Sequence, residues 1–464
     1  MTLEEAKRIV FDQKPEFAAL YKEYGDRTWL EYAESKYKKI PLPQTERSEE
    51  LLSTFQKILS PLVGNERSNK AVETLRQNSL VSSADHHGIL CHPFFSNSSL
   101  VRSHPNITAS NQSIISFACG CISLSNSSYP RGIFFHDKNL EEVRMPFVSL
   151  QGRKRSLYGL SSISKNNIQK QIDRLDSIDI DKDKKNKLGA FFKKIIEDKK
   201  IWERKYFSEQ ITIINSILWN ELFGESRGDL IYIEIETLVR ELILNFHLDT
   251  NTLISKIIFE ENVRNKYIEN FEGIVGAHRT KERKGSHLFW YIDEAENTRK
   301  QLFLNGNQLE TLDKKTSIPV ISSLIKEQLL QYRLLPSMAL CYSIVSFYYG
   351  VTLGGGFSQI QYLADIKKAF DKTVNKEIID NVTNIFTGEE VLLTMSNQDN
   401  TIGATLIDLL IYGEGSINKA VDEEIENKKI NDTLSYMMDE FVEIVTGTKE
   451  KISDLPKIKP TFNV

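Results

Sequence analysis

Three runs of apolar side chains, each leading into polar residues, most constrain what this chain can fold into. They occupy residues 80–83, 114–122 and 132–136. Strands that are apolar on both faces are typical of a parallel sheet covered on both sides by other elements. These runs therefore predict three neighbouring strands at the centre of the protein.

A fourth strand is predicted for residues 229–236, which return to an apolar pattern after a long polar stretch. The amphipathic residues 238–246 follow it and predict a helix, with Thr237 as its N-cap. A strand, a turn and a helix in succession form a βα unit. The sequence therefore predicts an α/β fold.

Helical patterns surround these strands and divide the chain into five parts. Apolar residues recur at helical spacing near residues 51–62, and residues 164–223 are rich in Lys, Asp, Glu and Ile with little Gly or Pro. Residues 287–292 and 299–304 predict a β-hairpin. We expect a Rossmann-like parallel sheet core in two parts (78–163 and 229–375, the second with the hairpin), a helical N-terminal segment (1–77), a helical insertion (164–228) and a helical C-terminal region (376–464).

The composition argues against nucleic-acid and membrane partners. The 464 residues carry a net charge of −4, which gives no electrostatic basis for binding phosphate backbones. Residues 334–351 are the most apolar run, but Pro336 interrupts them, so they predict a buried helix and not a membrane span. The first residues lack the apolar core of a signal peptide, and the four cysteines then favour reduced thiols in the cytoplasm. We expect a small-molecule partner; the oligomeric state stays open.

The strongest functional signal is a cluster of imidazoles and thiols after the first strand. Five of the eight histidines and three of the four cysteines lie between residues 86 and 136. The sequence Asp85-His86-His87-Gly88 follows the strand, and His92 precedes a predicted helix at 94–101. The carboxyl ends of parallel strands are where α/β proteins usually bind their ligands.

This loop has three interpretations. Asp85, His86 and His87 beside Gly88 and His92 suit a nucleotide site, in which imidazoles at a helix N-terminus contact phosphates. Asp85, His87 and His92 with one cysteine offer donors for Zn²⁺, but their spacing matches no closed zinc pattern. The turn could also hydrogen-bond only to its own backbone. We favour substrate or nucleotide contact, with ATP or ADP as cofactor and no metal.

Four further features fall near predicted strand ends. Arg131 lies in a polar loop and could bind a carboxylate or phosphate by two hydrogen bonds. Glu236 shares a strand face with Glu234 and would lie at the mouth of a cleft. Gly354, Gly355 and Gly356 form a predicted turn before a helix and offer backbone amides to an anion. Cys119-Gly-Cys121 is a buried strand end, or a nucleophile if Cys121 reaches the histidines. A surface, dipole or packing role is the alternative for each.

The order of these landmarks resembles that of the cysteine-adding enzymes of bacillithiol biosynthesis. That family has a strand, a turn of the form Gly-Gln-Gln-x-Gly-Leu and a Gly-Pro before a helix. Residues 83–93 have the same shape, with Gly88 and Pro93 in register. The family's helix ending in Leu-Phe and its next strand correspond to residues 217–223 and 230–235.

Later landmarks of that family also have counterparts here. They are a hairpin (288–292 and 299–302), a Leu-Pro (Leu335-Pro336), a Gly-Pro-Gly turn (354–356) and a helix with Tyr362 and Lys367-Lys-Ala-Phe370. The resemblance covers roughly residues 70–370. The family's acidic Glu-Asp-His-Asp run is replaced here by residues 119–131, and its C-terminal coiled coil is reduced or absent.

The resemblance implies a ligase or transferase that joins an amino acid or other small acid to an amine, with a nucleotide as cofactor. In this reading the imidazoles and Arg131 stabilise charge on the activated acyl group and Glu236 orients the amine. Two alternatives remain. One is a binding or assembly protein that has lost catalysis. The other is a metal-dependent hydrolase, since Asp-His-His also occurs in DHH phosphoesterases, although residues 1–75 lack their Asp-rich motif.

Overall fold

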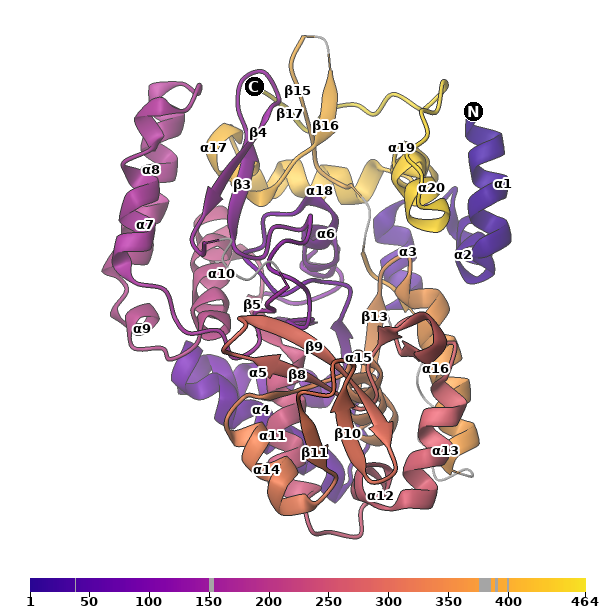
Figure 1. Ribbon diagram of the computed structural model, residues 1–464. Coiled ribbons are helices and arrows are strands. Elements are labelled where there is room, and N and C mark those ends of the chain that lie inside the picture. Colours follow the sequence, from indigo (N-terminus) through magenta and orange to yellow (C-terminus); the bar gives the residue numbers. More distant parts are fainter. Residues whose placement is uncertain (38, 150–153, 375–384, 389–390, 399) are drawn as a thin grey trace.

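A five-stranded parallel sheet forms the centre of the computed structural model, which describes residues 1–464 except 38, 150–153, 375–384, 389–390 and 399 (Figure 1). Its strand order is β14-β13-β1-β2-β5. The strands are β1 (Leu80–Ser82), β2 (Ser113–Ala118), β5 (Asp229–Glu234), β13 (Thr352–Gly355) and β14 (Ile385–Phe386). All six residues of β2 are buried. The predicted α/β class and the strands beginning near residues 80, 114 and 229 are thereby confirmed.

The chain crosses this sheet in two directions from its central strand. It runs outward from β1 to β2 and β5, then returns to place β13 on the other side of β1. Ser82 of β1 is thus paired with Ser116 of β2 and with Gly354 of β13. The loops after β1 and β13 leave the same edge of the sheet, because parallel strands end on one side.

Helices surround the sheet and supply most of the core. α10 packs along β5, and α5 and α6 contact β2. In α4, the side chains of Leu51, Leu52, Phe55, Leu59 and Leu62 are buried, as their helical spacing predicted. The helices that precede β5 in the chain are α1 (Leu3–Gln13), α2 (Pro15–Tyr24), α3 (Trp29–Lys36), α4 (Glu46–Val63), α5 (Asn65–Gln77), α6 (Pro93–Arg102), α7 (Lys165–Ile172), α8 (Lys182–Glu197), α9 (Lys199–Trp202) and α10 (Phe207–Phe223).

A second, antiparallel sheet of five strands, in the order β11-β10-β9-β8-β12, lies below the first in Figure 1. Its centre is the predicted hairpin, in which Trp290 pairs with Gln301 and Ile292 with Arg299. Its strands are β8 (Phe289–Asp293), β9 (Thr298–Asn305), β10 (Gln308–Thr311), β11 (Ser317–Pro319) and β12 (Leu334–Pro336). The helices of this region are α11 (Ile235–Phe246), α12 (Leu253–Phe259), α13 (Glu261–Phe271), α14 (Ser322–Leu330), α15 (Met338–Tyr342) and α16 (Gln359–Val374).

The C-terminal region contains helices and short strands. Its helices are α17 (Leu406–Tyr412), α18 (Ile417–Asn427), α19 (Ile430–Tyr436) and α20 (Met438–Thr446). The strands β15 (Thr394–Ser396), β16 (Thr401–Gly403) and β17 (Phe462–Asn463) form a three-stranded sheet. Earlier in the chain, β6 (His278–Arg279) pairs with β7 (Lys284–Gly285). Among the described residues, no helix is both long and apolar enough to cross a membrane.

Four local predictions were wrong. Residues 132–136 form β3 (Gly132–His136), which pairs antiparallel with β4 (Glu142–Pro146) outside the parallel sheet. α11 begins at Ile235 with Glu234 as N-cap residue, so Thr237 does not cap it and Glu236 lies on the helix. Gly354 and Gly355 belong to strand β13 and not to a turn. Residues 334–351 are not one helix; they form β12, α15 and a π-helical segment, Ser343–Tyr348.

Candidate functional site

Polar side chains from two neighbouring strands meet where β2 and β5 end. Glu236, in the first turn of α11, is fully buried, and its carboxylate accepts hydrogen bonds from the backbone N–H groups of Gly120 at 2.8 Å and Cys121 at 2.9 Å. Both oxygens are therefore engaged with the segment that follows β2. Glu236 holds the position of Cys121, the next residue toward the surface.

Glu234, the last residue of β5, packs directly against Gly120. A Cβ atom at residue 120 would lie 2.1 Å from Glu234 Oε1, so any larger residue there would displace the Glu234 carboxyl. Oε1 has no hydrogen-bond partner among the described residues, and Oε2 accepts one from the Thr237 hydroxyl. Burial, reinforced by the charge of Glu236, raises the pKa of Glu234 to about 8. At neutral pH this carboxyl therefore holds a proton.

A cavity of about 260 Å³ opens beside Cys121. Arg299 of β9 and Trp290 of β8 form one wall, and the guanidinium lies over the indole ring, 4.2 Å from its centroid. The Arg299 guanidinium makes no hydrogen bond or ion pair with the residues that the structure describes, although it carries five N–H donors. The remaining wall comes from Ile274, Gly276, Ala277, His278, Arg279, Lys284, Gly285, Ser337 and Met338.

The electrostatics of this cavity favour an anion. Burial lowers the pKa of Arg299, and the charges of Cys121 and Glu236 oppose that shift. A second hollow of about 600 Å³ shares Trp290 and Arg299 with the first. Its Lys300 is neutralised by Asp293, Glu296 and Asp313 at 2.8, 2.9 and 3.2 Å. Arg299 thus stands between two hollows as a cation with open hydrogen-bonding capacity.

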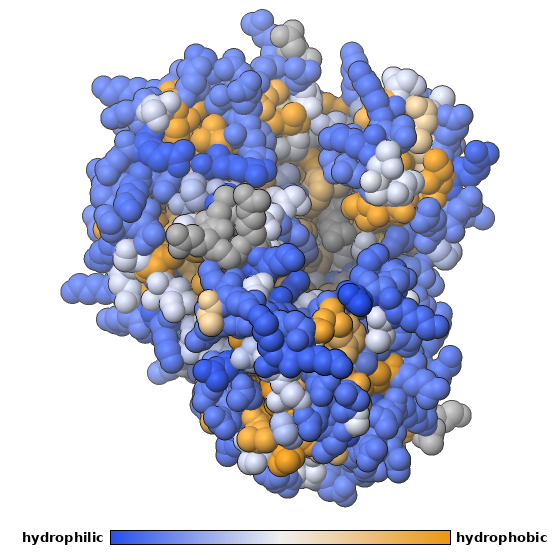
Figure 2. Space-filling model, in the orientation of Figure 1, coloured by the Kyte–Doolittle hydropathy of each residue, from blue (hydrophilic) through white to orange (hydrophobic). Residues whose placement is uncertain are grey.

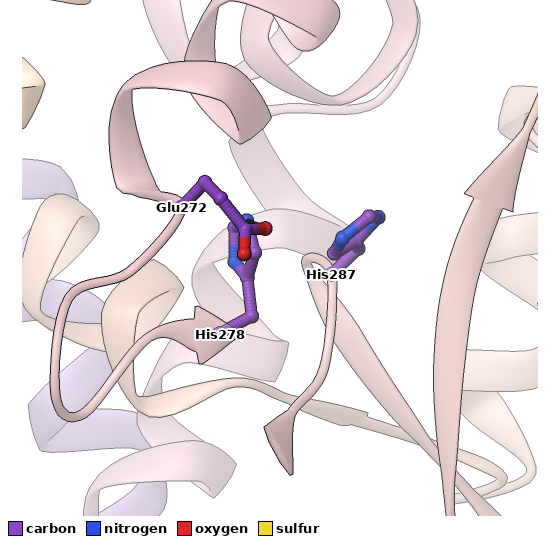
Figure 3. A group of neighbouring side chains, drawn as sticks. All are labelled: Glu272, His278 and His287. Carbon is purple, nitrogen blue, oxygen red and sulfur yellow. Dashed lines mark ion pairs between the residues drawn. The ribbon is translucent and has the colours of Figure 1, made fainter. Parts of the chain in front are cut away.

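His278, which lines the cavity, belongs to a cluster with Glu272 and His287, whose candidate ligand atoms lie within 4.8 Å of one another (Figure 3). Thr280 links Glu272 to His287, because it donates its hydroxyl to Glu272 Oε2 at 2.6 Å and lies 3.2 Å from His287 Nε2. Figure 3 shows that Glu272 follows the end of α13, His278 lies on the short strand β6 and His287 lies on a loop beside them.

The hydrogen bonds of this cluster do not fit a metal ion. His278 Nε2 donates to the Ile268 carbonyl at 2.9 Å, and His287 Nδ1 accepts from the Leu304 N–H at 2.9 Å, which leaves the proton on His287 Nε2. Both nitrogens that face Glu272 and Thr280 are thus protonated, whereas a metal ligand needs a lone pair. We interpret the cluster as a structural network that fixes residues 272–287 along the cavity.

His86 and His92 lie at a different cavity, of about 290 Å³, between α6 and α20. His86 Nδ1 is 3.0 Å from Ser128 Oγ, and its ring packs on Phe95. Burial lowers the pKa of His86 to about 4 and that of His92 to about 3, so both imidazoles are neutral. His92 caps α6 by accepting the Phe94 N–H at 3.2 Å. These two rings therefore bring no positive charge to the phosphate contact that the sequence predicts for them.

Asp85, His87 and Gly88 point into the protein and not into this cavity. Asp85 and His87 are fully buried. His87 Nε2 donates to the Ser208 carbonyl at 3.2 Å, its ring stacks on Tyr232, and burial lowers its pKa to about 4. A Cβ atom added at Gly88 would lie 3.1 Å from Pro130 Cα, and the Gly88 carbonyl accepts a hydrogen bond from Asn215. Within the described residues, Asp85, His87 and His92 do not form a metal-ligand group.

The other predicted site residues are also dispersed. The Arg131 guanidinium stacks on Tyr129 at 4.5 Å, beside the β3–β4 hairpin. Gly354 and Gly355 have close neighbours, because Cβ atoms there would lie 2.2 Å from Thr387 and 2.6 Å from Gln359. Close packing thus explains these glycines, and Gly356 follows them at the end of β13. Of the predicted residues, the structure brings Glu236 together with Cys121, and His86 together with His92 at a separate cavity.

Arg299 and Trp290 escaped the sequence analysis, although the hairpin that carries them was predicted. Their register puts Arg299 opposite Ile292, so Trp290 is its diagonal neighbour on the same face. An arginine and a tryptophan on one hairpin face were the available signal. No protein-family model matches the chain, and comparison with curated proteins found no similar sequence.

Proposed function

We propose that the chain is a ligase- or transferase-like enzyme of small-molecule biosynthesis that joins a small acid to an amine, and that Arg299 binds the acid. The observation that carries this proposal is the Arg299 guanidinium, which lines a 260 Å³ cavity and has no anionic or carbonyl partner among the described residues. Arginine recognises carboxylates and phosphates through two parallel hydrogen bonds.

The fold supports the same reading. Numbered by appearance in the chain, the strands of the parallel sheet are ordered 3-2-1-4-5, which is the order of a Rossmann-like core. We propose ATP or ADP as the cofactor on the strength of this order and of the resemblance described above. The four cysteines are free thiols, which suits a cytoplasmic location.

The cavity beside His92, separate from that of Arg299, supports binding of a cation such as an amine outside the reacting centre. It joins the aromatic rings of Phe94 and Phe95 to the carboxylates of Glu440 and Glu443. Burial raises the pKa of Glu440. A protonated amine would supply a positive charge that stabilises the ionised Glu440 carboxylate, and aromatic rings also attract such cations.

A thermal-shift screen tests the proposal. Inorganic phosphate, ATP and ADP with Mg²⁺, and small mono- and dicarboxylates are titrated against the wild-type chain and against Arg299→Gln. We expect at least one anion to raise Tm, since a ligand at 100 times its Kd adds about 2.7 kcal/mol, and Arg299→Gln to abolish the shift. The control, Arg283→Gln, removes an exposed arginine outside the cavity and should keep the shift. An unmoved Tm, or an unchanged shift in Arg299→Gln, would contradict the proposal.

A further inference from the structure

Cys121 lines the cavity that also contains Arg299. Cys91, Cys119 and Cys341 are buried, whereas Cys121 is partly exposed and lines the 260 Å³ cavity with Arg299 and Trp290. Its backbone N–H donates to Glu236 at 2.9 Å, so its position is fixed from behind by a buried carboxylate. A thiol with a fixed position and an accessible sulfur has the geometry that covalent chemistry requires.

The pKa values of the three buried thiols are raised. Burial raises the pKa of the Cys91 thiol to about 12, and the pKa of Cys341 lies well above its ordinary value for the same reason. The Cys119 thiol also has a raised pKa, because of its hydrogen bond with Cys121 and its burial. Cys121 instead lines the cavity together with the Arg299 guanidinium, a cation that can hold an anionic group beside the sulfur.

We propose that Cys121 is a nucleophile that accepts the acyl group of an activated small acid, whose second, anionic group is held by Arg299. This inference rests on the proposed function and names its substrate class: an acyl phosphate that carries a further carboxylate or phosphate. Trp290 stacks on the guanidinium and holds it in the cavity wall. The cavity of about 260 Å³ limits the acid to a small molecule.

The reaction balances in two steps. Cys121 gives its proton to solvent, and its sulfur attacks the acyl carbon; a C–S bond forms, the C–O bond to phosphate breaks, and phosphate leaves with the electron pair. The amine then attacks the thioester carbon. A C–N bond forms, the C–S bond breaks, sulfur leaves as the thiolate, and the amine proton passes to solvent.

Two alkylating reagents of matched shape test this inference on the intact chain. Iodoacetate carries a carboxylate and iodoacetamide is its neutral counterpart; sulfur displaces iodide from either. Rates are followed by intact mass and peptide mapping. We expect alkylation at Cys121, with a ratio of iodoacetate to iodoacetamide rates about tenfold above that of 2-mercaptoethanol, because the cation steers the anion. Cys121→Ser should show no fast adduct.

Variants of Arg299 identify the source of this preference. Arg299→Gln should lower the ratio to that of 2-mercaptoethanol, and Arg299→Lys, which keeps the charge, should retain part of it. If anions raise Tm through Arg299 but Cys121 reacts with neither reagent faster than 2-mercaptoethanol, the inference is overturned and the proposed function stands. If Cys121 reacts quickly without preference and Arg299→Gln changes nothing, Arg299 does not hold the anion and both proposals fail.

Discussion

His136 at the end of β3 donates from Nδ1 to Asp408 Oδ2 of α17 at 2.8 Å. The backbone N–H of His136 also donates to Asp408 Oδ1 at 2.7 Å. Burial opposes the charge on His136, but the hydrogen bond and the charge of Asp408 outweigh it and raise the pKa of this imidazole. The β3–β4 hairpin, which is outside the parallel sheet, is thus tied to the C-terminal helices by a charged contact.

The stability from this pair should depend on pH. The unfolded pKa of histidine is about 6.5. The folded pKa is higher, so the stabilisation is fully present below about pH 6.5 and is lost as pH rises through the folded value. We expect His136→Gln to lower the free energy of unfolding by about 2 kcal/mol at pH 6 and by less at pH 9. Urea denaturation at both values measures this, and an equal loss at both would be evidence against a charged His136.

Glu234 should give a pH dependence of the same sign for a different reason. Its folded pKa of about 8 exceeds that of an unfolded glutamate. Between about pH 4.3 and 8 the folded chain binds a proton that the unfolded chain has released, so stability falls as pH rises through this window. Glu234→Gln removes this cost. We expect its stability relative to wild type to increase by up to about 1.4 kcal/mol per pH unit in that window. Chemical denaturation at pH 5 and pH 8 compares the free energies of unfolding of the wild type and Glu234→Gln. The same difference at both pH values would show that Glu234 is ionised.

Gly120→Ala should disturb the same acid. The new Cβ would lie 2.1 Å from Glu234 Oε1, and we expect a loss of about 1–3 kcal/mol. Gly189→Ala in α8 is the matched control, since its Cβ would meet only Leu175 at 3.6 Å and should stabilise by up to about 1 kcal/mol. In a Glu234→Ala background the Gly120→Ala penalty should shrink, as a double-mutant cycle would show. If the stability losses of Gly120→Ala and Glu234→Ala were additive, the Gly120→Ala penalty would not come from contact with Glu234.

The Glu272–His278–His287 cluster should bind no metal, because its tautomers point protons at the candidate site. We expect Zn²⁺ and Ni²⁺ titrations to give no saturable heat that His287→Ala removes. Thr280→Val breaks the link between His287 and Glu272 and should speed hydrogen exchange in residues 272–287. Stoichiometric zinc in purified protein, lost in His287→Ala, would refute this interpretation.

The elements of the fold were predictable where one short stretch decides them. β2 is apolar throughout and buried throughout, and the hairpin of β8 and β9 has alternation and a turn in its own residues. The strand with which a given strand pairs cannot be derived from its own residues. β3 is as apolar as β2, but its buried side packs on α17 and not in the sheet. Its sequence therefore could not distinguish the two arrangements.

The candidate site was predictable only in part, because it depends on where side chains point. His86 and His87 are adjacent, so they face opposite ways; one lines a cavity and the other contacts the Ser208 carbonyl in the core. Glu236 was expected at the end of the strand. It lies instead in the first turn of α11, where its carboxylate accepts hydrogen bonds from backbone N–H groups. Arg299 lies beside Cys121 because the hairpin packs near the end of β2, and this packing is not encoded in one short stretch of sequence.

The central position of β1 has a consequence for synthesis of the chain. Its neighbour on one side, β13, begins at Thr352, 272 residues after its pairing partner Leu80. Until the ribosome has made that strand, one edge of β1 stays open, and nascent chains of about 300 residues would present an unpaired apolar edge. Such intermediates would need chaperones, and C-terminal truncations before residue 352 should aggregate instead of forming a stable half-protein.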